Sequence, residues 1–415
     1  MPKTYGEINE KIREGNAVVL TKDEFLAEVD GKGLSKCAEE VDIVTTGTFG
    51  PMCSSGAFIN VGHSKPRIKL GGGVVTLNGV PAYAGIAAVD LYIGATAMQG
   101  GSKKKIGGRE KPSYGGGHVL HDLVAGKDIK LVADAHGTDC YPRKKLETYI
   151  NLRDINEAIL CNPRNAYQNY NCAVNLSDKK IYTYMGVLKP NIGNAHYCSA
   201  GQLSPLFNDP LYRTTGVGTR IFLGGGVGYV FSKGTQHNPG VTRAENGTPK
   251  TSAGTIAVTG DLKKMSPDWL VGVSFPSYGP TLRVGIGVPI PMLDEQMAKF
   301  AAVKDSEIFT QIVDYSEAYP QCIPGSLGEV SYAQLKGGTI RVRNSDVPVR
   351  NLSNYKKAVE ISIVLKHWLR SAKMTITEPL ETLPSAESGY AFKPLRERGR
   401  RKGSPEAGRN RYKKP

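Results

Sequence analysis

The stretch RIKLGGGVVTLNGVPAYAG, residues 67–85, alternates short apolar runs with glycines and an Asn-Gly pair. Such runs predict short strands, and Asn78-Gly79 is typical of a two-residue hairpin turn. The whole chain has 49 glycines and 25 prolines in 415 residues, and its middle part is predicted as short strands joined by turns. Similar strand-like segments recur at 41–47, 129–137 and 255–260.

Helical patterns flank these strands. Residues 4–14 read as an amphipathic helix, and a second helix is predicted from Thr21, which with Glu24 forms a capping-box pattern. Strands and helices neither alternate regularly nor segregate cleanly, so the sequence predicts a mixed α+β fold with Gly-rich β segments and packed helices rather than a doubly wound one. Further helices are predicted at 154–160, 292–304 and 354–371.

The sequence shows no signal peptide and no membrane span. Its first residues are polar and charged, and no uncharged apolar run reaches the roughly 18 residues that a transmembrane helix needs. A hydrophobic content of 40% is enough for a sizeable core. We therefore expect a cytoplasmic globular protein.

The net charge of +15 is concentrated at one end of the chain. Residues 393–415 contain ten Lys and Arg and two Glu, a net +8. This segment has almost no apolar residues, so we expect 385–415 to be a disordered basic tail. Through it the chain would bind RNA or an acidic partner nonspecifically, whereas the body shows no aromatic-interleaved basic surface for nucleic acid. A merely solubilising extension fits the same composition.

The seven cysteines include no C-x-x-C pair, so neither a zinc ribbon nor a thioredoxin-like motif is encoded and no metal site is predicted. In a cytoplasmic protein they stay reduced, and a reduced cysteine is commonly a small buried hydrophobe. We predict this role for Cys37, Cys161, Cys172 and Cys322.

Cys140 lies in GTDCYPRKK, residues 137–145, just past a segment predicted as a buried strand. Loops at strand ends often present reactive groups, and neighbouring cations favour the nucleophilic thiolate. Arg143, Lys144 and Lys145 supply such cations, while Asp139 opposes them unless it pairs with Arg143. A reactive thiol and a packed loop cysteine both fit these local features.

Cys53 lies in an irregular loop of Gly, Pro and Ser. Downstream of it, Lys65, Arg67 and Lys69 alternate, which on a strand would aim them to one side as a row for a substrate carboxylate. A solvated strand edge fits the same pattern. Cys198 has polar surroundings, and its role is left open.

Three glycine clusters invite a nucleotide-binding interpretation, yet none has the P-loop pattern and none meets the dinucleotide-binding fingerprint. In YGGGHVLHDLV, residues 114–124, the glycines open a predicted helix whose free N–H groups would suit a carboxylate or phosphate. His118 and His121 fall on one face of this helix, without a visible third metal ligand.

Long motifs spread over residues 5–384 carry a resemblance. They include GTFGPMCSSGAFINVGHSKPRIKLGGG, AHGTDCYPRK, NPRNAYQNYNCAVNLSDKKIYTYMG and GTRIFLGGGVGYV. Together they resemble the homocysteine biosynthesis family of methanogenic archaea and some anaerobic bacteria. The resemblance implies one large catalytic domain at 1–384. Many members carry a C-terminal pair of CBS modules, and we expect none in this chain.

What the resemblance implies is sulfur incorporation into L-aspartate semialdehyde to give L-homocysteine, through a cysteine persulfide. On motif position, the two cysteines that the family implicates fall on Cys53 and Cys140. Cys140 would carry the persulfide, and Cys53 would relay the sulfur or release it by forming a disulfide with Cys140.

The remaining groups of the reaction follow from its chemistry. The aldehyde oxygen needs a proton donor, for which His118, His136 or an N–H of the glycine-opened helix are candidates. The step from thiohemiacetal to thiol needs two electrons, and no flavin or nicotinamide motif is visible, so an external carrier is expected; the resemblance implies a small ferredoxin-type protein. The expected substrate-binding residues are Lys65, Arg67, Lys69, Arg143 and His118.

Three alternatives stay open. Cys53, Cys140 and Cys198 would also serve as ligands of an iron–sulfur cluster with one open iron, although their spacing is no ferredoxin signature. A non-enzymatic sulfur carrier or cluster scaffold, and an RNA-associated protein acting through the basic tail, are the competing classes. A homodimer is compatible with each.

Deletion of residues 393–415 separates the enzyme from the RNA-associated protein. We expect the truncated chain to keep its rate of homocysteine formation, because the family motifs end before the tail. Loss of salt-dependent RNA binding together with loss of the protein's activity would contradict this expectation.

Overall fold

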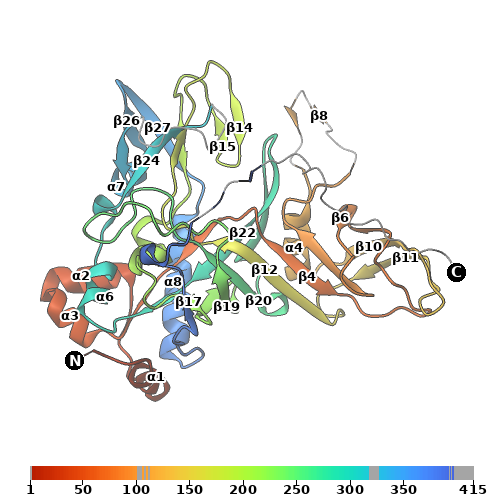
Figure 1. Ribbon diagram of the computed structural model, residues 1–415, viewed down its shortest axis with the longest axis horizontal. Helices are drawn as coiled ribbons and strands as arrows, with labels where there is room; N and C mark the ends of the chain where they lie inside the picture. The colour runs from red at the N-terminus through yellow and green to blue at the C-terminus, as the bar shows by residue number, and fades with distance from the viewer. Residues whose placement is uncertain are drawn as a thin grey trace, which may run out of the picture.

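The computed structural model describes residues 2–100, 105–106, 109–110, 113–316, 327–391, 393 and 395–396. Helices pack against antiparallel and mixed sheets, and helices and strands do not alternate regularly along the chain (Figure 1), so the predicted α+β fold is confirmed. Cys322 and residues 397–415 of the predicted tail lie outside the described residues.

A nine-stranded antiparallel sheet occupies the centre of the molecule (Figure 1). Eight strands follow in the order β21-β22-β18-β19-β20-β12-β4-β7, and β3 also pairs with β22. The bounds are β3 Thr48–Pro51, β4 Gly56–Asn60, β7 Asp90–Gly94, β12 Glu157–Asn165, β18 Arg220–Leu223, β19 Gly226–Lys233, β20 Ile256–Asp261, β21 Leu270–Phe275 and β22 Gly279–Gly287.

Two further sheets flank the central one on opposite sides (Figure 1). A four-stranded antiparallel sheet on the right has the order β11-β10-β5-β6, and a six-stranded mixed sheet at the upper left has the order β25-β24-β13-β16-β27-β26. Their bounds are β5 Val74–Leu77, β6 Val80–Ala82, β10 Ile129–Asp134, β11 Lys145–Ile150, β13 Cys172–Val174, β16 Ala195–Tyr197, β24 Phe309–Asp314, β25 Glu329–Ser331, β26 Thr339–Val342 and β27 Ser345–Asn351.

Smaller sheets complete the described strands: β1-β2-β23, with bounds Val19–Thr21, Ile43–Thr45 and Pro289–Pro291, and the pairs β8 Lys105–Ile106 with β9 Arg109–Glu110, β14 Ile181–Thr183 with β15 Gly186–Leu188, and β17 Gly216–Val217 with β28 Glu381–Thr382. The described α-helices are α1 Tyr5–Glu14, α2 Lys22–Lys32, α3 Leu34–Glu40, α4 Gly116–Val124, α5 Pro205–Asn208, α6 Glu295–Ala301, α7 Tyr332–Lys336 and α8 Tyr355–Arg370.

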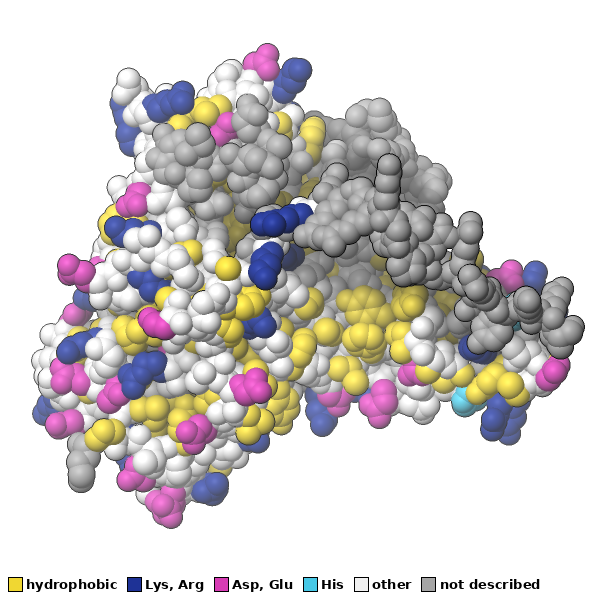
Figure 2. Space-filling model, viewed as in Figure 1, with side chains coloured by type: hydrophobic (Ala, Val, Ile, Leu, Met, Phe, Trp, Pro, Cys, Tyr) yellow, Lys and Arg dark blue, Asp and Glu magenta, His cyan; other side chains and the backbone are white. Residues whose placement is uncertain are grey.

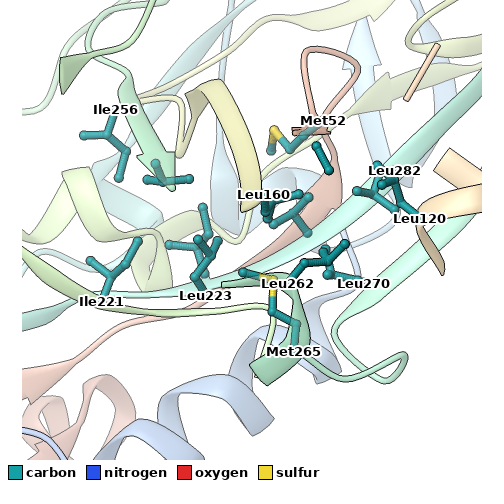
Figure 3. Packing of buried hydrophobic residues seen from close by; sticks show 14 of the residues in the cluster. Met52, Leu120, Leu160, Ile221, Leu223, Ile256, Leu262, Met265, Leu270 and Leu282 are labelled. Atoms are coloured by element: carbon teal, nitrogen blue, oxygen red, sulfur yellow. The ribbon is translucent and has the colours of Figure 1, made fainter. Parts of the chain in front are cut away.

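The largest core lies between the central sheet and the elements packed on it. Figure 3 shows Leu120 of α4 close to Leu282 of β22, with Met52 and Leu160 in the same cluster. The six-stranded sheet has its own apolar cluster with α7. Because these two cores are separate, the residues between them form a boundary at which a cavity can open.

Most predicted elements are present. Helices α1, α2, α6 and α8 confirm four of the predicted helices, and Thr21 with Glu24 forms the expected capping box. The predicted turn joins β5 to β6, with φ of 50° at Asn78 and 76° at Gly79.

The helix predicted at 154–160 is wrong, because β12 covers most of it. Burial there alternates with the period of a strand: Ala158 and Leu160 are fully buried, whereas Ile159 is 43% exposed. The strand is inserted between β4 and β20, and these pairings across the sequence override the local helix pattern.

Figure 2 shows the face of the molecule that is seen in Figure 1. Hydrophobic side chains gather over its middle, and charged side chains of both signs are spread over its left part. Outward-facing apolar residues of the central sheet include Phe58, Ile159 and Tyr229, each more than 40% exposed.

No helix in the described part of the chain combines the length and apolarity required to span a bilayer. At the start of the predicted tail, the ring of Tyr390 lies 6.1 Å from that of His237.

Lys22 opens α2 and is fully buried, with Nζ donating hydrogen bonds to the carbonyls of Ala301 and Val303. Burial lowers the pKa of Lys22 from 10.5 to about 7. Between pH 7 and pH 10.5, the Lys22 side chain is protonated in the unfolded chain and neutral in the folded chain. The free energy of unfolding should therefore rise with pH in this window, by up to roughly 5 kcal/mol, and the full penalty applies below pH 7.

The Lys22→Met variant should lose this rise, because it removes the titrating group. Urea unfolding at pH 7 and at about pH 9.5 measures it, with Lys36→Met on the exposed surface of α3 as the control. A pH dependence that is the same in Lys22→Met and in the unchanged protein would contradict the assignment.

Candidate functional site

A cavity of about 280 Å³, partly open to solvent, lies at the boundary between the central sheet and the six-stranded sheet. Its lining includes β3 and the turn that follows it, the end of β16, and the β14–β15 turn. The side chains that bear on its chemistry are Cys53, Arg164, Tyr170, Tyr184, Cys198 and Tyr278.

Cys53 lies in the turn between β3 and β4, and this turn is anchored on both sides. Ser54 Oγ donates to the carbonyl of Arg164 at 3.1 Å, and Ser55 Oγ accepts from Asn162 Nδ2 at 3.0 Å. The Thr281 hydroxyl of β22 donates to Cys53 Sγ at 3.4 Å. The half-buried thiol is therefore held by a fixed donor at the wall of the cavity.

Tyr278, in the turn between β21 and β22, is a second polar neighbour of Cys53. Burial raises the pKa of the Tyr278 hydroxyl; the negative charge and hydrogen bond of Cys53 also raise it, while Arg164 lowers it. Tyr278 thus keeps its proton at neutral pH, beside a sulfur atom and a guanidinium group.

A group of tyrosines forms the side of the cavity nearest the six-stranded sheet. The Tyr170 and Tyr184 hydroxyls lie 2.6 Å apart, and those of Tyr184 and Tyr315 lie 3.1 Å apart. The Tyr167 hydroxyl donates to Gln236 Oε1 at 2.9 Å. This wall combines apolar rings with hydroxyl groups and carries no acidic side chain among the described lining residues.

Cys198 follows the end of β16 and faces the same cavity as Cys53. Burial raises the pKa of its thiol to about 12; Arg283 acts in the opposite direction, and Cys53 adds to the increase. Cys198 is therefore a neutral thiol at rest, close enough to Cys53 for their charges to interact.

The structure places Cys140 elsewhere. It lies in the exposed loop after β10, where the Thr138 hydroxyl is 3.6 Å from its sulfur and the backbone groups of Thr138 and Tyr141 hydrogen-bond each other. The ring of Tyr141 stacks on His63 at 6.0 Å. This loop borders a second cavity of about 430 Å³, lined by residues that include Lys69 and His136.

The predicted basic row lies beside Cys140, not beside Cys53. Lys65, Arg67 and Lys69 are exposed, but the residue between the first two, Pro66, is exposed as well. The segment forms a single bridge, between Ile68 and Arg143, and not the expected strand. The Arg143 backbone N–H donates to the carbonyl of Arg67 at 3.1 Å.

Strand β4 separates the two thiols. Cys53 precedes its first residue, and His63, which stacks on the neighbour of Cys140, follows its last residue. Five strand residues span about 16 Å. A disulfide requires Cα atoms roughly 4.4–6.8 Å apart, so the arrangement shown does not bring Cys53 and Cys140 together for the predicted direct exchange.

The start of α4 does not provide the free N–H groups expected for an anion. The amides of Gly116 and Gly117 donate to the carbonyls of Ala97 and Ala95 at 2.8 and 2.9 Å. The glycines are needed for close packing instead, because a Cβ on Gly117 would overlap the carbonyl oxygen of Thr281. His118 Nδ1 accepts from the Gly115 amide at 3.2 Å, which caps the helix.

The three cysteines suggested as cluster ligands are not assembled, because Cys140 lies apart from Cys53 and Cys198. Within the described ranges, no group of three or more His, Cys, Asp or Glu side chains is arranged to hold a metal ion. The described donor set therefore does not fit an iron–sulfur cluster. Of the cysteines predicted as buried hydrophobes, Cys37 and Cys172 are buried, whereas Cys161 is half-buried.

Sequence reasoning missed Tyr278, Thr281, Arg283 and Arg164 as parts of a site. They lie more than 100 residues from Cys53, and only the pairing of β3 with β22 brings Thr281 and Arg283 to it. One signal was present: the density of tyrosines between residues 167 and 184 is high for a segment with short strands.

Comparison with known proteins gives a consistent result. The chain is 45% identical over 391 residues to a protein of Methanosarcina acetivorans named L-aspartate semialdehyde sulfurtransferase, covering 94% of this chain and 74% of that protein. A protein of the same name from Methanocaldococcus jannaschii is 45% identical over 406 residues, covering 95% and 75%. An uncharacterized protein of Methanothermobacter thermautotrophicus is 28% identical over 350 residues, covering 82% and 73%.

No solved structure matches the chain significantly. Residues 17–376 match the family described as homocysteine biosynthesis enzyme, sulfur-incorporation. With this match and relatives of 45% identity over most of the chain, the protein belongs to the homocysteine biosynthesis enzyme family.

Proposed function

We propose that this enzyme incorporates sulfur into L-aspartate semialdehyde to form L-homocysteine, and that Cys53 is the thiol that carries the sulfur as a persulfide. The names of the two relatives at 45% identity support the substrate and product. The observation that carries the assignment of Cys53 is its position in the cavity, where it accepts a hydrogen bond from Thr281 and interacts with Tyr278.

The size and lining of the cavity suit a small polar aldehyde. Its volume of about 280 Å³ is slightly below the range of roughly 300–1,000 Å³ that is typical of sites for drug-sized ligands, as expected for a smaller substrate. Arg164 lines the cavity and supplies a cation for the substrate carboxylate. Tyrosine rings exclude water around the carbonyl group, which strengthens electrostatic interactions within the site.

In the first step, the terminal sulfur of the Cys53 persulfide attacks the aldehyde carbon. A C–S bond forms, the C=O π bond breaks, and the oxygen takes a proton. Tyr278 is the proton donor that the geometry favours, since its raised pKa keeps it protonated next to Cys53. Thr281 holds the Cys53 sulfur in place through its hydrogen bond.

Further steps need electrons from outside the chain. Reductive cleavage of the S–S bond to Cys53 takes two electrons and two protons and gives the thiohemiacetal and the free Cys53 thiol. Loss of water and uptake of two further electrons and two protons then give the thiol of homocysteine. We propose a small ferredoxin-type protein as the carrier, acting in the cytoplasm. The exposed cations Lys65, Arg67 and Lys69 around Cys140 would attract an acidic carrier or sulfur donor to that loop.

Cys140 stays a candidate for the entry of sulfur. Its exposure and the nearby cations Arg143 and Lys144 suit exchange with an external donor. When polysulfide is supplied directly, its sulfane sulfur passes to the Cys53 thiolate as one S–S bond breaks and another forms, so this entry step is not needed and the chemistry depends on Cys53.

The variants Cys53→Ser and Cys140→Ser test this order of importance. With polysulfide as the sulfur source and a reductant for the later steps, we expect Cys53→Ser to lower the rate of homocysteine formation by roughly 10³-fold or more, because the sulfur-carrying group is lost. Cys140→Ser should stay within about tenfold of the unchanged enzyme, and Cys161→Ser serves as the control thiol. Undiminished activity of Cys53→Ser would exclude Cys53 as the sulfur carrier.

Mass spectrometry of the same proteins provides a direct measurement. After incubation with sulfide under mild oxidation, the peptide containing Cys53 should gain one sulfur atom. If the added sulfur atom were found on the Cys140 peptide alone, the persulfide would have to be assigned to Cys140 in the exposed loop and not to Cys53.

The variant Tyr278→Phe tests the proton donor. Removing one donor to a developing oxyanion typically lowers kcat by 10²–10³-fold, and we expect a loss of about 10² with little change in KM. Tyr182→Phe, an exposed tyrosine of β14, is the matched control. An unchanged kcat for Tyr278→Phe would show that the proton comes from another group.

A further inference from the structure

We propose that Cys198 is the resolving thiol of the reaction: it attacks the Cys53 sulfur, releases the sulfur-bound intermediate and leaves a Cys53–Cys198 disulfide. This inference rests on the proposed function, in which Cys53 carries the sulfur. It replaces the exchange partner expected from the sequence, Cys140, with a thiol inside the cavity.

Among the cysteines of the described residues, Cys198 is the one that shares the cavity with Cys53. Cys37 and Cys172 are buried in separate apolar clusters, and Cys161 does not line the cavity. Cys140 lies beyond β4. Among the described cysteines, the position of Cys198 therefore makes it the candidate for disulfide exchange with Cys53.

The backbone brings Cys198 against the strand that leads to Cys53. A Cβ built on Gly50 of β3 would lie 3.3 Å from Cys198 Sγ, a distance tighter than ordinary contact. Gly50 precedes Cys53 by three residues, so both sulfur atoms border the same short segment. Glycine at this position leaves room for the sulfur.

Hydrogen bonds hold the end of β16 in this place. The Leu352 amide donates to the carbonyl of Tyr197 at 2.8 Å, and the Asn354 amide donates to the carbonyl of Phe49 at 2.9 Å. The segment 352–354 thus ties the residue before Cys198 to the residue before Gly50. The approach of the two thiols is built into the backbone.

The surroundings give the two thiols different roles. Cys53 accepts a hydrogen bond from Thr281, whereas burial keeps Cys198 protonated at rest. Arg283 acts on Cys198 in the opposite direction, and its Nε is buried without a hydrogen-bond partner in the described part of the chain. This guanidinium can stabilise the Cys198 thiolate at the moment of attack.

The step balances as a thiol–disulfide exchange. After C–S bond formation, the intermediate is attached to Cys53 through an S–S bond. Cys198 sulfur attacks Cys53 sulfur, the Cys53–Cys198 bond forms, and the bond to the substrate sulfur breaks. The proton of Cys198 passes to the leaving sulfur, which gives the thiohemiacetal. Cys53 and Cys198 together lose two electrons, and the transferred sulfur gains them.

Resetting the pair takes two electrons and two protons. The external carrier of the proposed function, or a dithiol such as dithiothreitol in the test tube, supplies them. The enzyme should consequently stop after one release per chain when no reductant is present.

A single-turnover experiment tests the inference. The enzyme is loaded with sulfur on Cys53, freed of excess reagent, mixed with L-aspartate semialdehyde without reductant, and analysed by non-reducing peptide mass spectrometry. We expect a cross-linked peptide pair containing Cys53 and Cys198. In Cys198→Ser the substrate-derived mass should stay on the Cys53 peptide, and dithiothreitol should release it.

The controls keep the result interpretable. Cys161→Ser should form the cross-link as the unchanged enzyme does, and Cys198→Ala serves as a second variant with circular dichroism to confirm folding. Release from Cys198→Ser at the rate of the unchanged enzyme, or a cross-link from Cys53 to another cysteine, would overturn the inference. Absence of added sulfur on Cys53 in the unchanged enzyme would overturn the proposed function, and this is seen before the substrate is added.

Discussion

The close backbone contact between the first turn of α4 and the β21–β22 hairpin determines how the cavity is built. Gly117 lies against the carbonyl of Thr281, and a Cβ on Gly272 would lie 2.6 Å from the Cα of His118. His121 Nδ1 accepts from the Gly272 amide at 3.3 Å, which locks the helix to the hairpin. Since β3 pairs with β22, the same contact fixes the strand that carries the Cys53 turn.

This constraint explains why one face of β22 carries the chemistry. Thr281 and Arg283 are two residues apart and therefore point to the same side of the strand. Thr281 reaches Cys53, and Arg283 acts on Cys198. The turn at the end of the hairpin adds Tyr278. A single hairpin thus brings a hydrogen-bond donor, a cation and a tyrosine hydroxyl to two thiols from different sheets.

The molecule presents two sulfur environments with different physical character. Among the described residues that line the cavity, Arg164 is the one that carries a charge, and burial holds Cys198 as a neutral thiol. The Cys140 loop is exposed and surrounded by cations, which suits collisions with other molecules. In the proposed mechanism, this separation would keep a persulfide on Cys53 away from thiols in solution, which would otherwise remove its sulfur.

The sequence by itself determined the local features: the capped helices α1 and α2, the Asn78-Gly79 turn, the α+β class and the candidate thiols Cys53 and Cys140. These depend on capping, turn chemistry and motifs, which act over a few residues. The helix expected at 154–160 failed because strand pairing across the chain outweighs a local pattern.

Only the tertiary structure decided which groups meet. The basic row and Cys140 lie on one side of β4, whereas Cys53 joins Cys198, Tyr278 and Arg164 on the other. Such partners are separated by more than 100 residues along the chain. Contacts of this kind arise from sheet order and from the packing of one backbone on another, and neither leaves a pattern with a short period in the sequence.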